Sequence, residues 1–268
     1  MLSGSSPFET TLEGFERAFQ VRHIATYDVV MCAALEQVHS VFARYPDFDQ
    51  IPVAVDGRIV GVLEARNVER SGSVEQHMRR LDDSILIAAD APLNHFLPLL
   101  REAPYYRLVL DGARIRGVVT RSDILKLPVR LFAFGLVTHL EMVMADIIQS
   151  LCPHDWMQHL DAERQAQVTK KEQELQAQRA NPDRLELTDF CDKRDIVRQI
   201  CKLSNRFKDD LVSIERMRNS IAHAGNYAAN DQELIAFLKR LDRAQYWIRE
   251  LYQRNSPVAI RDSAETAA

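Results

Sequence analysis

A short hairpin pattern occurs twice in this chain, and it restricts the possible folds more than any other feature. Residues 51–63 and residues 107–119 each read as an apolar run, an Asp-Gly pair and a second apolar run. Asp-Gly is a strong hairpin signal because glycine tolerates the positive φ that tight turns need. Helical periodicity precedes each hairpin, at about residues 31–43 and 93–101, and a short helix is expected after each. This order predicts two βαββα units in tandem.

The pattern changes near residue 129, where the strand signals stop and long helical patterns begin. We therefore expect an α+β part followed by an all-α bundle, with a polar and charged linker between the two hairpin units. The predicted segments are a leader helix at 1–20, the paired units at 21–128 (about 21–70 and 82–128), a helical domain at 129–255 and a disordered tail at 256–268.

Composition narrows the classes of function. The chain has 268 residues and a formal net charge of −4, so it has no overall attraction for nucleic acid, and any RNA contact must depend on a local basic patch. No run approaches the roughly 18–20 consecutive apolar residues of a membrane span, and residues 1–7 lack the features of a secretory signal. The four cysteines have no metal-ligand spacing, so we expect reduced thiols in the cytoplasm and no metal.

The second hairpin unit ends in the string Gly-Val-Val-Thr-Arg-Ser-Asp at residues 117–123. This string and the repeat around it resemble the CBS family, whose paired modules bind nucleotides. The resemblance implies that the Thr120 hydroxyl contacts a ligand phosphate and that the Asp123 carboxylate takes the ribose hydroxyls. It also implies that the backbone of the strand through Ile85 and Ile87 contacts the base. An adenine-type nucleotide is the implied regulatory ligand.

The residue types in this string also suit a phosphate. Thr120 and Asp123 lie three apart at a predicted strand-to-helix junction, where a helix N-terminus favours anions, and Arg121 could add a charged contact. The first unit has Glu64 and Asn67 at the corresponding positions, and a carboxylate facing a phosphate is unfavourable. We therefore expect at most one competent nucleotide site, built by the second unit. The alternative is that Thr120 and Asp123 only cap a helix.

A second string stands late in the helical part, where Arg218-Asn219-Ser-Ile-Ala-His223 is followed by Ala-Gly225. It resembles the motif of the HEPN family, and region 129–255 looks like a HEPN helical bundle. In catalytic members the motif marks metal-independent RNA cleavage, with the 2′-hydroxyl of the RNA as nucleophile. Histidine suits proton transfer near neutral pH and arginine suits phosphate. The resemblance thus gives Arg218, Asn219 and His223 as catalytic candidates.

Helix geometry limits how these three side chains could act together. Asn219 and His223 are one turn apart on one face, whereas Arg218 and His223 diverge by roughly 140° on a regular helix. A homodimer that brings two helix ends together would supply both groups, as HEPN nucleases are described to do. The alternative is structural: Arg218 pairs with an acid, and His223 caps the helix.

Together, the two resemblances predict a nucleotide-sensing protein in which the CBS pair controls a metal-independent endoribonuclease. We expect it to work as a homodimer, with RNA as substrate and no membrane partner. The resemblance implies a role in stress response or phage defence. Two alternatives stay open. One is a non-catalytic module that senses a nucleotide and dimerises, and the other is a toxin whose CBS pair is idle.

Overall fold

The chain forms two compact units, Met1–Val129 and Arg130–Ala268, each of which is described by itself. The expected tail at 256–268 lies outside the described residues, as do Asn67 and Gly225. Side chains are described from residue 12 onward. The computed structural model describes residues 7–66, 71–103, 105–223 and 227–254.

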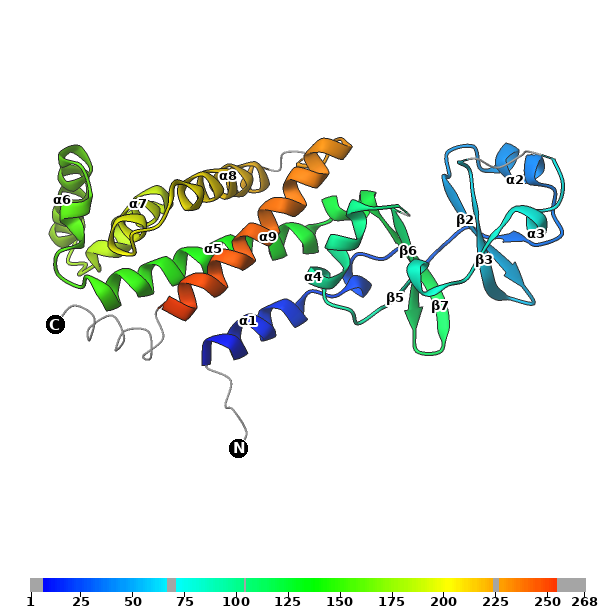
Figure 1. Ribbon diagram of the computed structural model, residues 1–268, viewed down its shortest axis with the longest axis horizontal. Helices are drawn as coiled ribbons and strands as arrows, with labels where there is room; N and C mark the ends of the chain where they lie inside the picture. The colour runs from blue at the N-terminus through cyan, green and yellow to red at the C-terminus, as the bar shows by residue number, and fades with distance from the viewer. Residues whose placement is uncertain (1–6, 67–70, 104, 224–226, 255–268) are drawn as a thin grey trace, which may run out of the picture. The chain divides into compact units, whose positions relative to one another are not determined.

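The first unit starts with helix α1 (Pro7–Ala18) and a short turn, η1 (Val21–His23), and continues into the first of two α/β modules (Figure 1). This first module is a four-stranded sheet in the order β1-β2-β3-β4, in which β1 pairs in parallel with β2 and the other pairs are antiparallel. Its elements are β1 (Cys32–Ala33), α2 (Val38–Arg44), β2 (Gln50–Val55), β3 (Arg58–Glu64), α3 (Val74–His77) and β4 (Arg79–Arg80).

The second module repeats this plan with three strands in the order β5-β6-β7, and β5 again pairs in parallel with the first hairpin strand. Both parts of the repeat therefore have the α/β character that the hairpin pattern predicts. Its elements are η2 (Asp83–Ile85), β5 (Leu86–Ala88), α4 (Leu93–Phe96), η3 (Leu97–Arg101), β6 (Tyr106–Asp111), β7 (Arg114–Thr120) and η4 (Arg121–Leu125).

Both hairpins turn at their Asp-Gly pairs. Asp56 and Gly57 have φ values of 49° and 73°, and Gly112 has a φ of 61°. The helix expected at residues 31–43 was placed too early, and helix α2 begins only at Val38. The reason is that the preceding residues pair with β2 as strand β1 and so leave the helical conformation.

A shared apolar core joins the two modules. Val62 of β3 packs with Ile85, Tyr106 and Leu108 of the second module, and each of the four side chains is at most 4% exposed. Full burial of a side chain such as valine or leucine contributes about 1.5–3 kcal/mol relative to exposure. The modules therefore form one packed body in which side chains from both can face the same cleft.

Gly117 on β7 is expected to tolerate no side chain. A Cβ atom there would lie 2.8 Å from the Thr26 carbonyl oxygen, and Thr26 is fixed because its N–H and its carbonyl oxygen both bond to Val118. We expect Gly117→Ala to lower the free energy of unfolding by about 1–3 kcal/mol, the usual cost of overpacking. Urea denaturation measures this. The control is Gly14→Ala, because a Cβ at Gly14 meets no atom within 4 Å. Equal stability of the two variants would contradict the prediction.

The second unit is helical and is built along α5 (Leu127–Leu151), which begins at the end of the first unit (Figure 1). The buried side of α5 carries Phe132, Leu136, Leu140 and Ile147, spaced by whole helical turns. Helix α8 packs against both α7 and α9. The remaining elements are η5 (Trp156–His159), α6 (Ala162–Ala177), η6 (Arg184–Leu187), α7 (Phe190–Ile200), α8 (Asn205–Ala222) and α9 (Asp231–Arg254).

Among the helices that the structure describes, α5 alone is long and apolar enough to cross a membrane. Its most apolar 18-residue window has a mean hydropathy of 1.7, and half of that window is buried. This test uses only the length and the composition of a helix, and the buried core helix of a protein outside a membrane also passes it. The absence of a membrane partner therefore stays a prediction.

Candidate functional site

A cleft of about 840 Å³ opens in the first unit between side chains of both modules. Its volume lies within the range of about 300–1,000 Å³ that small-molecule sites occupy. Pro98, Leu99, Tyr105 and Tyr106 give it apolar and aromatic surface. The remaining lining is rich in charged side chains, and their signs differ between the two walls.

The wall from the first module is balanced in charge. It contributes two acids, Asp49 and Glu64, and two arginines, Arg66 and Arg79. Glu64 is the last residue of β3, and its Oε1 accepts a hydrogen bond of 2.5 Å from the Tyr106 hydroxyl and lies 3.6 Å from Arg79 Nη1. Burial first, and the Glu64 carboxylate second, raise the pKa of Tyr106 well above its usual range. Glu64 is thus held at the cleft by groups from both modules.

The wall from the second module is cationic. Arg101, Arg107 and Arg121 line it against one acid, Glu102, which leaves a formal excess of two positive charges. Arg107 is 7% exposed, and burial, followed by repulsion from Arg79, lowers the pKa of its guanidinium. A local excess of positive charge attracts ligands of the opposite sign. This wall is therefore suited to an anion.

Arg121 is placed by an aromatic neighbour. Its guanidinium carbon lies 4.0 Å from the centre of the Tyr105 ring, in a cation–π contact. Thr120 and Ser122, on either side of it in the chain, also line the cleft. The cationic wall therefore combines a stacked arginine with the hydroxyl of Ser122, while the Thr120 hydroxyl donates to Asp123 Oδ2.

Asp123 serves as a capping residue. Its Oδ2 accepts hydrogen bonds from the Thr120 N–H at 2.6 Å and from the Thr120 hydroxyl at 3.1 Å, and its Oδ1 lies 2.6 Å from Lys126 Nζ. The side chain is 8% exposed and is not part of the cleft lining. Asp123 thus makes the contacts that the capping alternative expects, with both of its carboxylate oxygens engaged.

Of the other residues that the sequence suggested for the nucleotide site, some line the cleft and some do not. Thr120 and Arg121 reach the cleft, whereas Ile85 and Ile87 are not among its lining residues. Ile85 was expected in a strand, but it ends the turn η2, and its side chain is fully buried in the core between the modules. The packing of this side chain against Tyr106 fixes it there, and strand β5 begins one residue later.

Two arginines of the cationic wall were missed, because Arg101 and Arg107 lie on segments of the second module other than the one that carries the motif with Arg121. The expected pairing of the two hairpin strands could have indicated that Arg107 lies near the motif. Tyr106 pairs with Thr120 across β6 and β7, so residues beside Tyr106 must lie near the Thr120 end of β7.

In the helical unit, the structure separates Arg218 from His223. Arg218 Nη1 lies 3.3 Å from Glu141 Oε2 on α5, and the guanidinium lies over the ring of Phe190. Asn219 and His223 are both exposed at the C-terminal end of α8, where His223 is the cap and its N–H donates to the Asn219 carbonyl oxygen at 3.1 Å. One chain thus brings together Asn219 and His223, and it pairs Arg218 with an acid on another helix.

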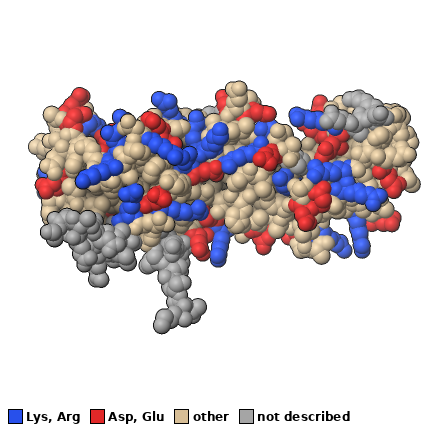
Figure 2. Space-filling view, viewed as in Figure 1, with Lys and Arg blue, Asp and Glu red and all other residues tan. Residues whose placement is uncertain are grey.

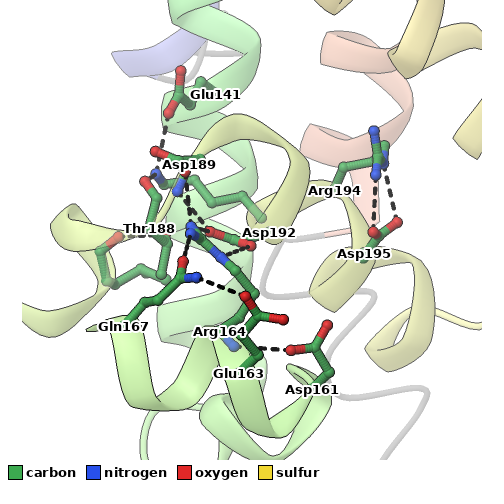
Figure 3. A network of polar contacts seen from close by, with 12 residues as sticks. Glu141, Asp161, Glu163, Arg164, Gln167, Thr188, Asp189, Asp192, Arg194 and Asp195 are labelled. Carbon is green, nitrogen blue, oxygen red and sulfur yellow. Dashed lines mark hydrogen bonds and ion pairs between the residues drawn. The ribbon is translucent and has the colours of Figure 1, made fainter. Parts of the chain in front are cut away.

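Helix α7 organises the charges around this region. Asp192, Lys193 and Arg194 follow one another in the sequence, and all three are at most 7% exposed. Each bonds to a different neighbouring helix, so that α7 connects α5, α6 and α8. Their partners are, in order, Arg164 of α6 (3.0 Å), Glu141 of α5 (3.1 Å) and Glu215 of α8 (3.4 Å). Figure 3 shows the contact of Asp192 with Arg164.

Two observations bear on RNA and metal partners. On the face seen in Figure 2, cationic and anionic side chains are interspersed, and no broad area of one sign is visible. Within the described part of the chain, no group of three or more histidine, cysteine, aspartate or glutamate side chains is placed to hold a metal ion.

Two α/β modules packed around a shared core, with a charged cleft between them, define a paired α/β module. Residues 74–130 match the family model of the CBS domain, and the chain therefore contains a CBS domain. The N-terminal part has the CBS-type α/β fold, and the C-terminal part is helical. No curated protein matches the chain.

Solved structures with some likeness to this chain include three CBS proteins. The CBS domain of a bacterial CNNM/CorC-family Mg²⁺ transporter, solved with ATP, is 20% identical, with 46% of this chain and 94% of that chain covered and a TM-score of 0.37. A CBS domain pair/ACT domain protein from Thermotoga maritima is 21% identical (44% and 97% covered, TM-score 0.33). The CBS domain pair of another protein, solved with 5′-methylthioadenosine and S-adenosyl-L-methionine, is 18% identical (39% and 95% covered, TM-score 0.33). The family-model match, rather than these weak likenesses, assigns the domain.

Proposed function

We propose that this protein senses a nucleotide, and that the phosphates of the nucleotide bind the cationic wall of the cleft. The observation that carries the proposal is the convergence of Arg101, Arg107 and Arg121 on one wall beside the hydroxyl-bearing residues Thr120 and Ser122. Arginine is always charged and pairs with phosphate oxygens through two N–H groups at once. A formal excess of two positive charges suits a ligand with at least two negative charges.

The aromatic surface beside these arginines supplies the second half of a nucleotide site. Tyr105 and Tyr106 line the same cleft, and the stacked pair of Tyr105 and Arg121 offers a flat face against which a base can lie. An adenine-type nucleotide is the first ligand to test, because the repeat resembles the CBS family. We propose that the bound nucleotide regulates the helical unit within a homodimer.

Removing one arginine from the cationic wall is expected to weaken nucleotide binding. Arg121→Ala deletes a charged hydrogen-bond donor, which is worth about 1.5–3 kcal/mol, so the dissociation constant should rise by roughly ten- to a hundredfold. Isothermal titration of the full chain with ATP, ADP and AMP measures this. Arg114→Ala is the matched control, because Arg114 is exposed on β7 and is not part of the cleft lining. Equal losses in both variants, or no binding by the wild type, would contradict the proposed site.

A second candidate function for the helical unit is metal-independent RNA cleavage. The observation that favours it is the exposed pair of Asn219 and His223 at the end of α8, one helical turn apart. An exposed imidazole can exchange protons with a substrate, and a second copy of the chain could bring another helix end to it. The competing function is a non-catalytic sensor, favoured by the pairing of Arg218 with Glu141. An RNA cleavage assay distinguishes the two.

A further inference from the structure

Two residues hold equivalent places in the two modules and face the same cleft. Glu64 ends β3 and pairs with Gln50 across the first hairpin, while Thr120 ends β7 and pairs with Tyr106 across the second. Both belong to the cleft lining. The first module thus presents a carboxylate where the second presents a hydroxyl, and the two walls offer different chemistry to one ligand.

Of the carboxylates at the ends of the two hairpins, Glu64 rather than Asp123 is accessible in this cleft, which Asp49 and Glu102 also line. The side chain of Glu64 is 36% exposed, whereas that of Asp123 is 8% exposed. Both polar contacts of Glu64 among the described residues, with Tyr106 and Arg79, are made through Oε1, so Oε2 is available to accept a hydrogen bond. In contrast, Asp123 uses one oxygen for Thr120 and the other for Lys126.

The chemistry of a carboxylate decides which part of a nucleotide it can meet. A carboxylate accepts hydrogen bonds and repels phosphate, whereas the 2′- and 3′-hydroxyls of ribose donate hydrogen bonds. We infer that Glu64, and not Asp123, accepts the sugar hydroxyls of the nucleotide, an inference that rests on the proposed nucleotide site. The ligand then lies with its sugar at the first-module wall and its phosphates at the second-module wall.

The supports of Glu64 fit this role. The Tyr106 hydroxyl at 2.5 Å comes from the second module, and Arg79 at 3.6 Å comes from β4 of the first, so the carboxylate is fixed from two sides before a ligand arrives. Preorganisation of an acceptor reduces the ordering cost of binding and sharpens selectivity for a donor at that place. The expected consequence is a preference for ribonucleotides over their 2′-deoxy counterparts.

The test compares the dissociation constants of ATP and 2′-deoxy-ATP, and of GTP and 2′-deoxy-GTP, for the full chain. A hydrogen bond to a charged acceptor predicts that the wild type prefers the ribonucleotide by about tenfold or more. In Glu64→Ala this ratio should fall to about one, while in Asp123→Asn it should stay as in the wild type. The ratio is measured within each variant, so a general loss of stability does not mimic the effect.

The outcomes separate the two levels of the proposal. If none of the four nucleotides binds, the nucleotide site and the inference are both overturned. Tight binding without preference for ribose overturns the role of Glu64 and leaves the nucleotide site in place. A ratio that survives in Glu64→Ala and is lost in Asp123→Asn assigns the sugar to Asp123 and overturns the inference.

Discussion

Replacing Asp192 with alanine is expected to destabilise the helical unit by about 3–5 kcal/mol, the usual cost of removing one partner of a buried ion pair. Asp192 is 5% exposed, and its Oδ1 accepts a hydrogen bond of 3.0 Å from Arg164 Nε on α6. Its Oδ2 also accepts the Asp189 N–H at 2.8 Å, which closes the capping box that begins α7. The substitution therefore removes a link between two helices and a helix cap together.

Urea denaturation followed by far-UV circular dichroism measures this loss. The matched control is Asp195→Ala on the same helix, because the Asp195 side chain is 41% exposed and its partner Arg194 also contacts Glu215. Because Asp195 itself is exposed and Arg194 keeps Glu215 as a partner, this control should lose less free energy than Asp192→Ala. If the two variants lose the same free energy, the α7 charges do not hold the helices together as described.

Replacing His223 with alanine is expected to lower metal-independent RNA cleavage by about 10²–10⁴-fold, the usual contribution of a general acid or base. The reason is that an imidazole is the side chain whose ordinary pKa allows proton exchange near neutral pH. The measurement is cleavage of a mixed RNA pool by the full chain in EDTA, with and without ATP, ADP or AMP. A change in rate with one nucleotide would connect the cleft to the helical unit.

The control for that assay is His154→Ala, because His154 is another exposed histidine of the helical unit. Cleavage that persists in His223→Ala would exclude His223 as the proton-transfer group. No cleavage by a folded wild-type dimer under any condition would leave the non-catalytic sensor. The string from Arg218 to His223 would then be structural, as the contact between Arg218 and Glu141 already is.

The sequence predicted the paired modules because the decisive information is local. An Asp-Gly pair between two apolar runs specifies a hairpin whatever surrounds it, and Asp56, Gly57 and Gly112 have the positive φ values that such turns require. The start of α2 was predicted too early because parallel pairing of β1 with β2 is a non-local interaction. Local periodicity does not report such a contact.

The cleft could not be predicted in the same way. Its cationic wall needs Arg101, Arg107 and Arg121 to converge from separate segments, and only the packed structure places them together. Thr120 was predicted through its motif, but the same motif gave Asp123 a ligand role that its capping contacts now occupy. A capping box and a ligand motif share their residue types and spacing, so the sequence left both possibilities open.

A nucleotide is expected to bind in the cleft with its phosphates on the cationic wall. The most direct measurement is the crystal structure of the full chain grown with ATP. We expect phosphate oxygens within hydrogen-bond distance of Arg101, Arg107 or Arg121, and the ribose beside Glu64. A nucleotide bound at another place, or an empty cleft in crystals grown with excess ATP, would contradict this expectation.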